Sequence, residues 1–241
     1  MTGRRSYGDP CGVARGLDLV GDRWALLIVR ELLFGPRRFT DLRAGLPGAS
    51  PNVLSQRLDE LAAAGVVRRR RLAPPAASWV YDLTGWGHEL EDVLIALGRW
   101  GSQAPLMPAA ELSARALMLA LKTTFDAAAA GEWRARIELR LGEDRFSARV
   151  GDGRLELAAG TERDGDAGPA EPAGPAGDAG PGRAGDGMAD AVIEASAPAL
   201  RALVFGGRQA GEAERSGDLR IAGDRQAALR FLGLFPRPRP G

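Results

Sequence analysis

Residues 50–71, SPNVLSQRLDELAAAGVVRRRR, constrain the fold of this chain more than any other stretch. Ser50 can cap a helix that begins at Pro51, where the missing backbone N–H of proline does no harm. Helical spacing places three leucines on one face of that helix, namely Leu54, Leu58 and Leu61. Gly65 ends the helix, and four consecutive arginines follow in a short strand. The stretch therefore predicts an amphipathic helix at about residues 50–64 with a basic strand directly behind it.

The face of this helix opposite the leucines carries amides and hydroxyls. Asn52 and Gln56 lie one turn apart on that face, with Ser55 beside them. Because a carboxamide can form two hydrogen bonds to the N6 and N7 edge of adenine, these residue types suit the reading of DNA bases. An ordinary polar helix face is the alternative if the helix acts alone.

The segments on either side of this helix complete a winged helix-turn-helix pattern. Residues 36–48, PRRFTDLRAGLPG, predict a short helix with Thr40 as its N-cap. Residues 66–83 predict two strands joined by a proline-rich tip. In a winged helix-turn-helix the second helix enters the major groove, and the hairpin lies along the flanking phosphates. We therefore expect residues 50–64 to read bases and residues 66–83 to form a basic wing.

The arginine run can present only half of its charge to one partner, since side chains alternate across a strand. Arg68 and Arg70 share one face, and Arg69 and Arg71 share the other. Only one pair needs to reach phosphates, and we expect it to be Arg69 and Arg71, although the reverse assignment stays open. Residues 36–71 hold 8 arginines and 3 carboxylates, a local charge of +5 in a chain of net charge +1. The candidate DNA-binding residues are Arg37, Arg38, Thr40, Ser50, Asn52, Ser55, Gln56, Arg69 and Arg71.

Helical patterns also flank the winged helix-turn-helix segment. Residues 11–35 contain two such patterns with a break at Gly21–Asp22, and the second is apolar around most of its circumference, which is typical of a central buried helix. After the hairpin, Thr84 can cap a long helix that runs to about Gly101. This helix has more apolar positions than one core contact needs, which agrees with an interface to another chain. The candidate interface residues are Leu90, Val93, Leu94, Leu97 and Trp100.

Several of these segments occur together, in order, in one known family. The motifs GDRW, LLFGPRRFTDLR, SPNVLSQRLDEL and YDLTGWG make residues 9–103 similar to the HxlR family of bacterial winged-helix transcriptional regulators. The resemblance implies a sequence-specific regulator that is a homodimer and binds a pseudo-palindromic operator. It also implies that the first helix and the long helix after the wing form the dimer.

Cys11 occupies a position that some members of this family use to sense oxidants or electrophiles. It lies just before a predicted helix, where the helix dipole can stabilise a thiolate. The alternative is a small buried residue without a redox role, because only an exposed cysteine with thiolate character is reactive.

The second half of the chain predicts a sheet with one buried face. Residues 133–141 alternate strictly between apolar and charged side chains, and RFSARV and RLELA repeat the alternation after the turn signals GED and GDG. Two further strands and two helices follow in residues 189–235. We therefore expect an α+β fold in which an antiparallel sheet is covered by helices. Residues 160–187 hold 9 Gly and 4 Pro and no large apolar residue, which predicts a disordered acidic loop.

This strand and helix pattern resembles the sterol carrier protein fold, from which the acidic insertion departs. The resemblance implies an apolar ligand in a cavity between sheet and helices. Because the alternating face of residues 133–141 and the later helices can enclose such a ligand, the hypothesis is that it tunes DNA affinity. The candidate pocket residues are Trp133, Ile137, Leu139, Leu203 and Leu232. The alternative is a domain that only packs and aids dimerisation, since an apolar face is more often core than pocket.

The sequence thus predicts two domains, a winged helix-turn-helix domain at residues 1–103 and an α+β domain at 104–241. We expect no enzyme activity, no cofactor and no metal. His88, the sole histidine, has no metal-ligand partner at helical spacing, and Cys11 has no evident base. Without a signal peptide or membrane span in the sequence, a cytoplasmic protein is expected. The alternative function is a lipid-carrier or protein-interaction module whose winged helix does not read DNA.

Overall fold

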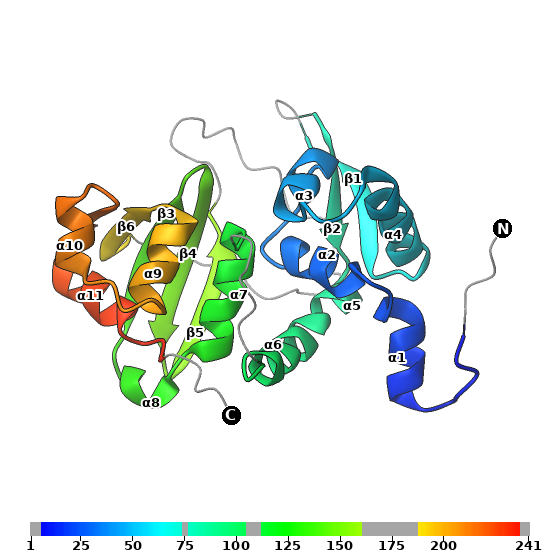
Figure 1. The fold of residues 1–241 in the computed structure, drawn as a ribbon, viewed down its shortest axis with the longest axis horizontal. Coiled ribbons are helices and arrows are strands. Elements are labelled where there is room, and N and C mark those ends of the chain that lie inside the picture. The colour runs from blue at the N-terminus through cyan, green and yellow to red at the C-terminus, as the bar shows by residue number, and fades with distance from the viewer. Residues whose placement is uncertain (1–5, 74–76, 105–111, 161–187, 237–241) are drawn as a thin grey trace, which may run out of the picture. The chain divides into compact units, whose positions relative to one another are not determined.

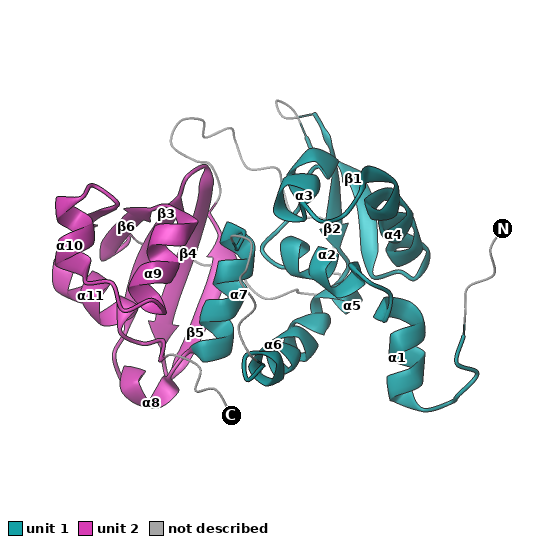
Figure 2. Ribbon diagram, in the orientation of Figure 1, with its two compact units in different colours: residues 1–124, 238–241 teal, residues 125–237 magenta. Residues whose placement is uncertain are grey.

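Residues 6–73, 77–104, 112–160 and 188–236 are described by a computed structural model of the chain. The chain divides into two compact units, residues 1–124 with 238–241 and residues 125–237 (Figure 2). The predicted loop at 160–187 lies outside the described residues except for its first residue, and so do residues 74–76 in the tip of the hairpin.

The N-terminal unit is a small helical core closed by a two-stranded hairpin (Figure 1). Its elements in chain order are α1 (Gly12–Val20), α2 (Ala25–Leu32), α3 (Phe39–Gly45), α4 (Pro51–Ala63), β1 (Val67–Arg71), β2 (Trp79–Leu83), α5 (Gly85–His88), α6 (Leu90–Gly101) and α7 (Ala114–Thr124). Helix α2 contacts α3, α4 and β2, so it is the central helix that the apolar pattern predicts. Its Ile28 and Leu32 are fully buried, as are Leu54, Leu58 and Leu61 of α4.

The beginning of α3 differs from the prediction. Thr40 was expected to be the N-cap, but the cap is Arg38 and the helix begins at Phe39. The carboxylate of Asp41 accepts a hydrogen bond of 3.2 Å from the Arg38 backbone N–H, which fixes the first turn two residues earlier. An ionised carboxylate is a stronger acceptor than a hydroxyl, and the Thr40 hydroxyl instead donates to Asp41 at 3.3 Å.

The long helix predicted to begin after Thr84 is two helices, α5 and α6, separated at Glu89. Thr84 does cap the first of them, since its hydroxyl accepts from the Gly87 N–H at 3.0 Å. A Cβ at Gly87 would lie 2.1 Å from the carbonyl oxygen of Val66. This close approach of α5 to the backbone before β1 requires glycine, which is a poor helix former and lets the chain turn before α6.

The N-terminal unit ends later than the boundary at residue 103 that the sequence suggests. Helix α7 belongs to it, because α7 contacts both α2 and α6. Thr123 of α7 would lie 3.2 Å from a Cβ placed at Gly98 of α6, so a glycine allows these helices to approach closely.

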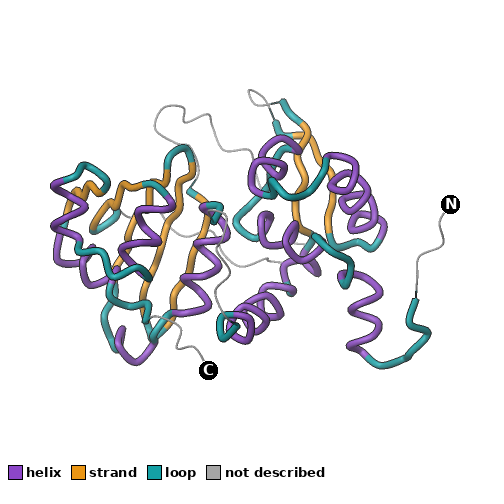
Figure 3. The backbone as a smooth tube through the Cα atoms, in the orientation of Figure 1, coloured by secondary structure: helices purple, strands orange, loops and turns teal. Residues whose placement is uncertain are grey.

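The C-terminal unit contains a five-stranded sheet with helices (Figure 3). Its elements are α8 (Ala127–Ala130), β3 (Ala135–Leu141), β4 (Asp144–Gly151), β5 (Arg154–Ala159), β6 (Ala191–Ala195), α9 (Ala197–Val204), α10 (Ala210–Arg215), β7 (Leu219–Gly223) and α11 (Arg225–Leu232). Alternate residues of β3 are buried, as the alternation predicts, and α11 contacts β3, β6 and β7. The strand order is β5-β4-β3-β6-β7.

The prediction of an all-antiparallel sheet is wrong at one pairing, because β6 runs parallel to β3. The antiparallel hairpins β3–β4 and β4–β5 form as predicted. Between Ala159 and Ala191 the chain crosses from the β5 edge to the other side of β3. A parallel neighbour needs a crossover connection of about a dozen residues or more, which this long connection supplies.

Candidate nucleic-acid interface

Helix α4 has the cap and the two faces that its sequence predicts. The Ser50 hydroxyl accepts from the Val53 N–H at 3.4 Å, and Pro51 occupies the first turn. The three leucines are buried, whereas Asn52, Ser55 and Gln56 are exposed. The side-chain amide of Gln56 donates to Glu60 at 3.0 Å, so one of its hydrogens is already engaged along the helix.

Arg57 lies on the flank of α4 and serves a structural purpose that the sequence pattern does not reveal. Its guanidinium lies 2.5 Å from the carboxylate of Asp22 and also pairs with Glu60. Only 14% of the side chain is exposed. This pair ties α4 to the turn between α1 and α2, so Arg57 does not belong to the exposed cationic surface.

The hairpin sorts the four arginines into two different environments. Arg68 and Arg70 lie beside Asp82 of β2, with N–O distances of 3.2 and 2.8 Å. Asp82 is only 7% exposed, so the two guanidinium groups neutralise a buried carboxylate. Their charge is therefore partly compensated within the hairpin, a detail that depends on the register Arg68↔Asp82.

Arg69 and Arg71 occupy the other face, and within the described residues neither forms an ion pair. The Arg69 guanidinium lies 4.8 Å from the ring centroid of Trp79, whose side chain is 54% exposed. Arg71 donates to the carbonyl oxygen of Ala77 at 3.1 Å. A cation over an aromatic face is partly ordered in advance of binding, so this face presents uncompensated and positioned positive charge.

The residues ahead of α3 are anchored to the hairpin. The backbone of Arg37 forms two hydrogen bonds with that of Tyr81, of 2.9 and 2.8 Å. Arg37 is half-buried, and Arg38 and Thr40 are exposed. Arg43, which the sequence reasoning missed, lines a groove of about 560 Å³ with Ser50 at the beginning of α4. Helix N-termini with a nearby cation attract phosphate groups. Arg43 could have been predicted from the sequence, because it lies only a few residues before the N-cap Ser50.

The predicted dimer residues divide into exposed and buried positions. Leu94 is 5% exposed and belongs to the core of the unit, while Leu90 is half-buried. Val93, Leu97 and Trp100 are 50%, 45% and 73% exposed and recur at helical spacing along α6. Other exposed apolar residues of the same unit include Val13 and Leu17 of α1, Leu27 of α2 and Trp86 of α5.

Cys11 is a free, exposed cysteine at the N-cap of α1. Cys11 is therefore not part of the interior of its own unit, and its redox role stays a prediction. His88 is exposed in α5. In the part of the chain that the structure describes, no group of three or more His, Cys, Asp and Glu side chains is placed to hold a metal ion. No described helix is both long and apolar enough to cross a membrane.

Two of the five residues predicted to line an apolar pocket lie within the packed interior of the C-terminal unit, and three are half-buried. Ile137 and Leu139 are 1% and 0% exposed. Leu203, Leu232 and Trp133 are half-buried, and the guanidinium of Arg230 lies 4.8 Å from the Trp133 ring.

The buried helical core, the capped α4 and the basic hairpin define a winged helix-turn-helix unit. The model of the HxlR-like helix-turn-helix family matches residues 19–107. The chain is 37% identical over 89 residues to the HTH-type transcriptional regulator YvaP of Bacillus subtilis, which covers 37% of this chain and 82% of that protein. The chain belongs to the HxlR-like helix-turn-helix family.

Other relatives match a similar proportion of the chain. The HTH-type transcriptional regulator sll1512 of Synechocystis is 36% identical over 95 residues, which is 39% of this chain and 70% of that protein. Among solved structures, the HTH-type transcriptional regulator ytcD is 30% identical with a TM-score of 0.36, over 38% of this chain and 94% of that one. The family model ends at residue 107, so the likeness of the C-terminal unit to sterol carrier proteins stays a prediction.

Proposed function

We propose that this protein is a dimeric DNA-binding transcriptional regulator that reads a pseudo-palindromic operator, with α4 in the major groove and the β1–β2 hairpin on the flanking phosphates. Its family consists of transcriptional regulators rather than enzymes. The observation that carries the proposal is the pairing of an exposed amide face on α4 with a hairpin face whose arginines lack carboxylate partners in the described chain.

The two parts of this surface have different physical tasks. Arg69 and Arg71 supply sequence-independent affinity, because neutralising phosphates releases counterions from DNA. Asn52 and Gln56 supply specificity through hydrogen bonds to base edges. Arg38, Thr40 and Arg43 are placed on or before α3 and add contacts that fix the orientation on the backbone.

Dimerisation through α6 is the second element of the proposal. Val93, Leu97 and Trp100 form an exposed apolar stripe, which is costly on a monomer that stays in water. A two-fold pairing along this stripe would present two copies of α4 to half-sites about one helical turn of DNA apart.

For the C-terminal unit we infer a packing role in preference to ligand-tuned regulation. Ile137 and Leu139 already fill the interior between sheet and helices, which supports core over pocket. The alternative function, a lipid-carrier or interaction module that does not read DNA, requires the cationic hairpin face to be only a solvated surface.

The test is a selection of bound fragments from genomic DNA with the full chain, followed by affinity measurements on the recovered sequence and on random DNA. A symmetric site bound at least about a thousandfold more tightly than random DNA at physiological salt supports the proposal. Equal affinity for the two DNAs, or a selection that enriches no sequence, contradicts it.

A further inference from the structure

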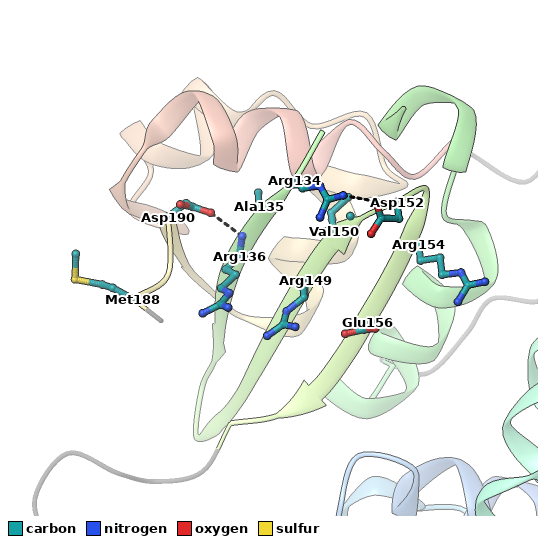
Figure 4. A pocket seen from close by; sticks show the side chains of 11 residues that line it. Arg134, Ala135, Arg136, Arg149, Val150, Asp152, Arg154, Glu156, Met188 and Asp190 are labelled. Carbon is teal, nitrogen blue, oxygen red and sulfur yellow. Dashed lines mark hydrogen bonds and ion pairs between the residues drawn. The ribbon is translucent and has the colours of Figure 1, made fainter. Parts of the chain in front are cut away.

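Arg136 of β3 and Arg149 of β4 are direct cross-strand partners in the C-terminal sheet. They project from the face opposite the buried one, since their neighbours Ala135 and Val150 are buried. Figure 4 shows the two side chains next to each other and directed the same way. The side chains of direct cross-strand partners lie within reach of each other, so one small anion can contact both guanidinium groups.

The two arginines line a groove of about 750 Å³ that is open to solvent. Arg134 and Arg154 add further positive charge to its lining. Arg134 is paired with Asp152 at 2.5 Å. Within the described residues Arg149 and Arg154 form no ion pair, although Glu156 of β5 is the cross-strand neighbour of Arg149. The groove therefore holds positive charge that its own carboxylates do not compensate.

Asp190 forms one wall of the groove beside the beginning of β3. The carboxylate of Asp190 accepts from the Arg136 backbone N–H at 2.7 Å, and the Asp190 N–H donates to the Arg136 carbonyl oxygen at 2.8 Å. This pair of bonds holds the backbone under Arg136 and limits where its guanidinium can reach. Paired guanidinium forks on a fixed backbone match the geometry of phosphate and carboxylate oxygens.

We propose that this groove binds a small organic anion that carries phosphate or carboxylate groups, held between Arg136 and Arg149. The volume lies within the usual range for small-molecule sites, roughly 300–1,000 Å³. A long polyanion fits less well, because the carboxylates of Asp152, Glu156 and Asp190 line the groove and would repel it along its length. A small anion can sit among the arginines and avoid those carboxylates.

The experiment is isothermal titration of the full chain with two probes, pyrophosphate and citrate, which separate a phosphate ligand from a carboxylate ligand. Arg149→Gln removes one charged fork and should weaken binding of the favoured probe roughly tenfold or more. Glu156→Gln removes a repelling carboxylate beside the site and should strengthen the same binding. Far-UV circular dichroism of each variant checks that it is folded, and if Arg149→Gln does not fold, Arg154→Gln takes its place beside Glu156→Gln.

Two control variants locate the binding. Arg201→Gln changes an exposed arginine on α9 outside the groove and should leave the affinity unchanged. Arg69→Gln removes a hairpin cation and should also have no effect, because the proposed site is independent of DNA binding. The proposal is overturned if neither probe binds at millimolar concentration, or if either control weakens binding as much as Arg149→Gln does. Random duplex DNA that binds through Arg149 when neither probe binds would also overturn it.

Discussion

The hydroxyl of Ser113 donates a hydrogen bond of 2.7 Å to the carboxylate of Glu31, a side chain that is only 2% exposed. The guanidinium of Arg30 lies 2.9 Å from the same carboxylate oxygen. Arg115, two residues after Ser113, is 6% exposed and donates to the carbonyl oxygens of Glu31 and Gly35 at 2.9 Å each. These bonds join the beginning of α7 to the central helix α2 and satisfy polar groups that are out of reach of water.

Ser113→Ala should therefore destabilise the protein by about 1–3 kcal/mol. The substitution removes a partner of the buried Glu31 and also the bond of 3.0 Å that the Ala116 N–H donates to the hydroxyl. Denaturant unfolding followed by tryptophan fluorescence measures the change. Ser147→Ala, at an exposed position of β4, is the matched control and should change stability by less than about 0.5 kcal/mol. Equal stability of the two variants would show that the hydrogen bond between Ser113 and Glu31 contributes nothing.

Asn52→Ala should relax DNA specificity at one or two operator positions by about 1–3 kcal/mol and leave binding to random DNA nearly unchanged. Gln56→Ala should do the same to a smaller extent, since the Gln56 amide already donates to Glu60 in the free protein. Competition binding against a panel of operators with single base changes reports the loss of specificity. Gln226→Ala, an exposed glutamine on α11, is the control. Uniform weakening on every sequence would remove base reading from α4.

Replacement of Arg69 and Arg71 by Gln should weaken binding to all DNA. It should also make the negative slope of log affinity against log salt shallower, by about 0.9 for each phosphate that the variant no longer neutralises. The matched variant replaces Arg68 and Arg70. It should lower the free energy of unfolding and leave the salt slope nearly unchanged, because it leaves the carboxylate of Asp82 buried without its partners. If the salt slope falls only in the second variant, the opposite face of the hairpin contacts DNA.

Leu97→Asp should convert a dimer to a folded monomer, because Leu97 is 45% exposed and the new charge disrupts only an intermolecular contact. Leu94→Asp should instead unfold the N-terminal unit, because Leu94 is 5% exposed and its substitution buries an unpaired charge. Analytical ultracentrifugation together with circular dichroism distinguishes the two outcomes. A Leu97→Asp variant that stays dimeric would place the interface elsewhere.

Fatty acids and sterols should leave the melting temperature of the full chain unchanged. Ile137 and Leu139 are packed in the interior, and a ligand stabilises a protein only if it binds the folded state. Differential scanning fluorimetry over a range of lipid concentrations is the measurement. A rise in melting temperature that grows with lipid concentration would favour ligand-tuned regulation by the C-terminal unit over the packing role.

The sequence by itself determined the features that depend on neighbours along the chain. Ser50, Pro51 and the leucine stripe were enough to predict α4, and the alternation in residues 133–141 was enough to predict the buried face of β3. Both follow from the fixed repeat of a helix or a strand, which sets the direction of each side chain before any tertiary contact forms.

The tertiary structure decided which residues of a pattern are buried, paired or exposed. Arg68 and Arg69 are indistinguishable in a run of arginines, and only the register of β2 places Asp82 beside the first and Trp79 beside the second. In the same way, the contact of α7 with α6 accompanies the burial of Leu94 while Val93 stays exposed, and a crossover makes β6 parallel to β3. These outcomes depend on residues far apart in the chain, whose proximity arises from packing and charge pairing and leaves no periodic signal in the sequence.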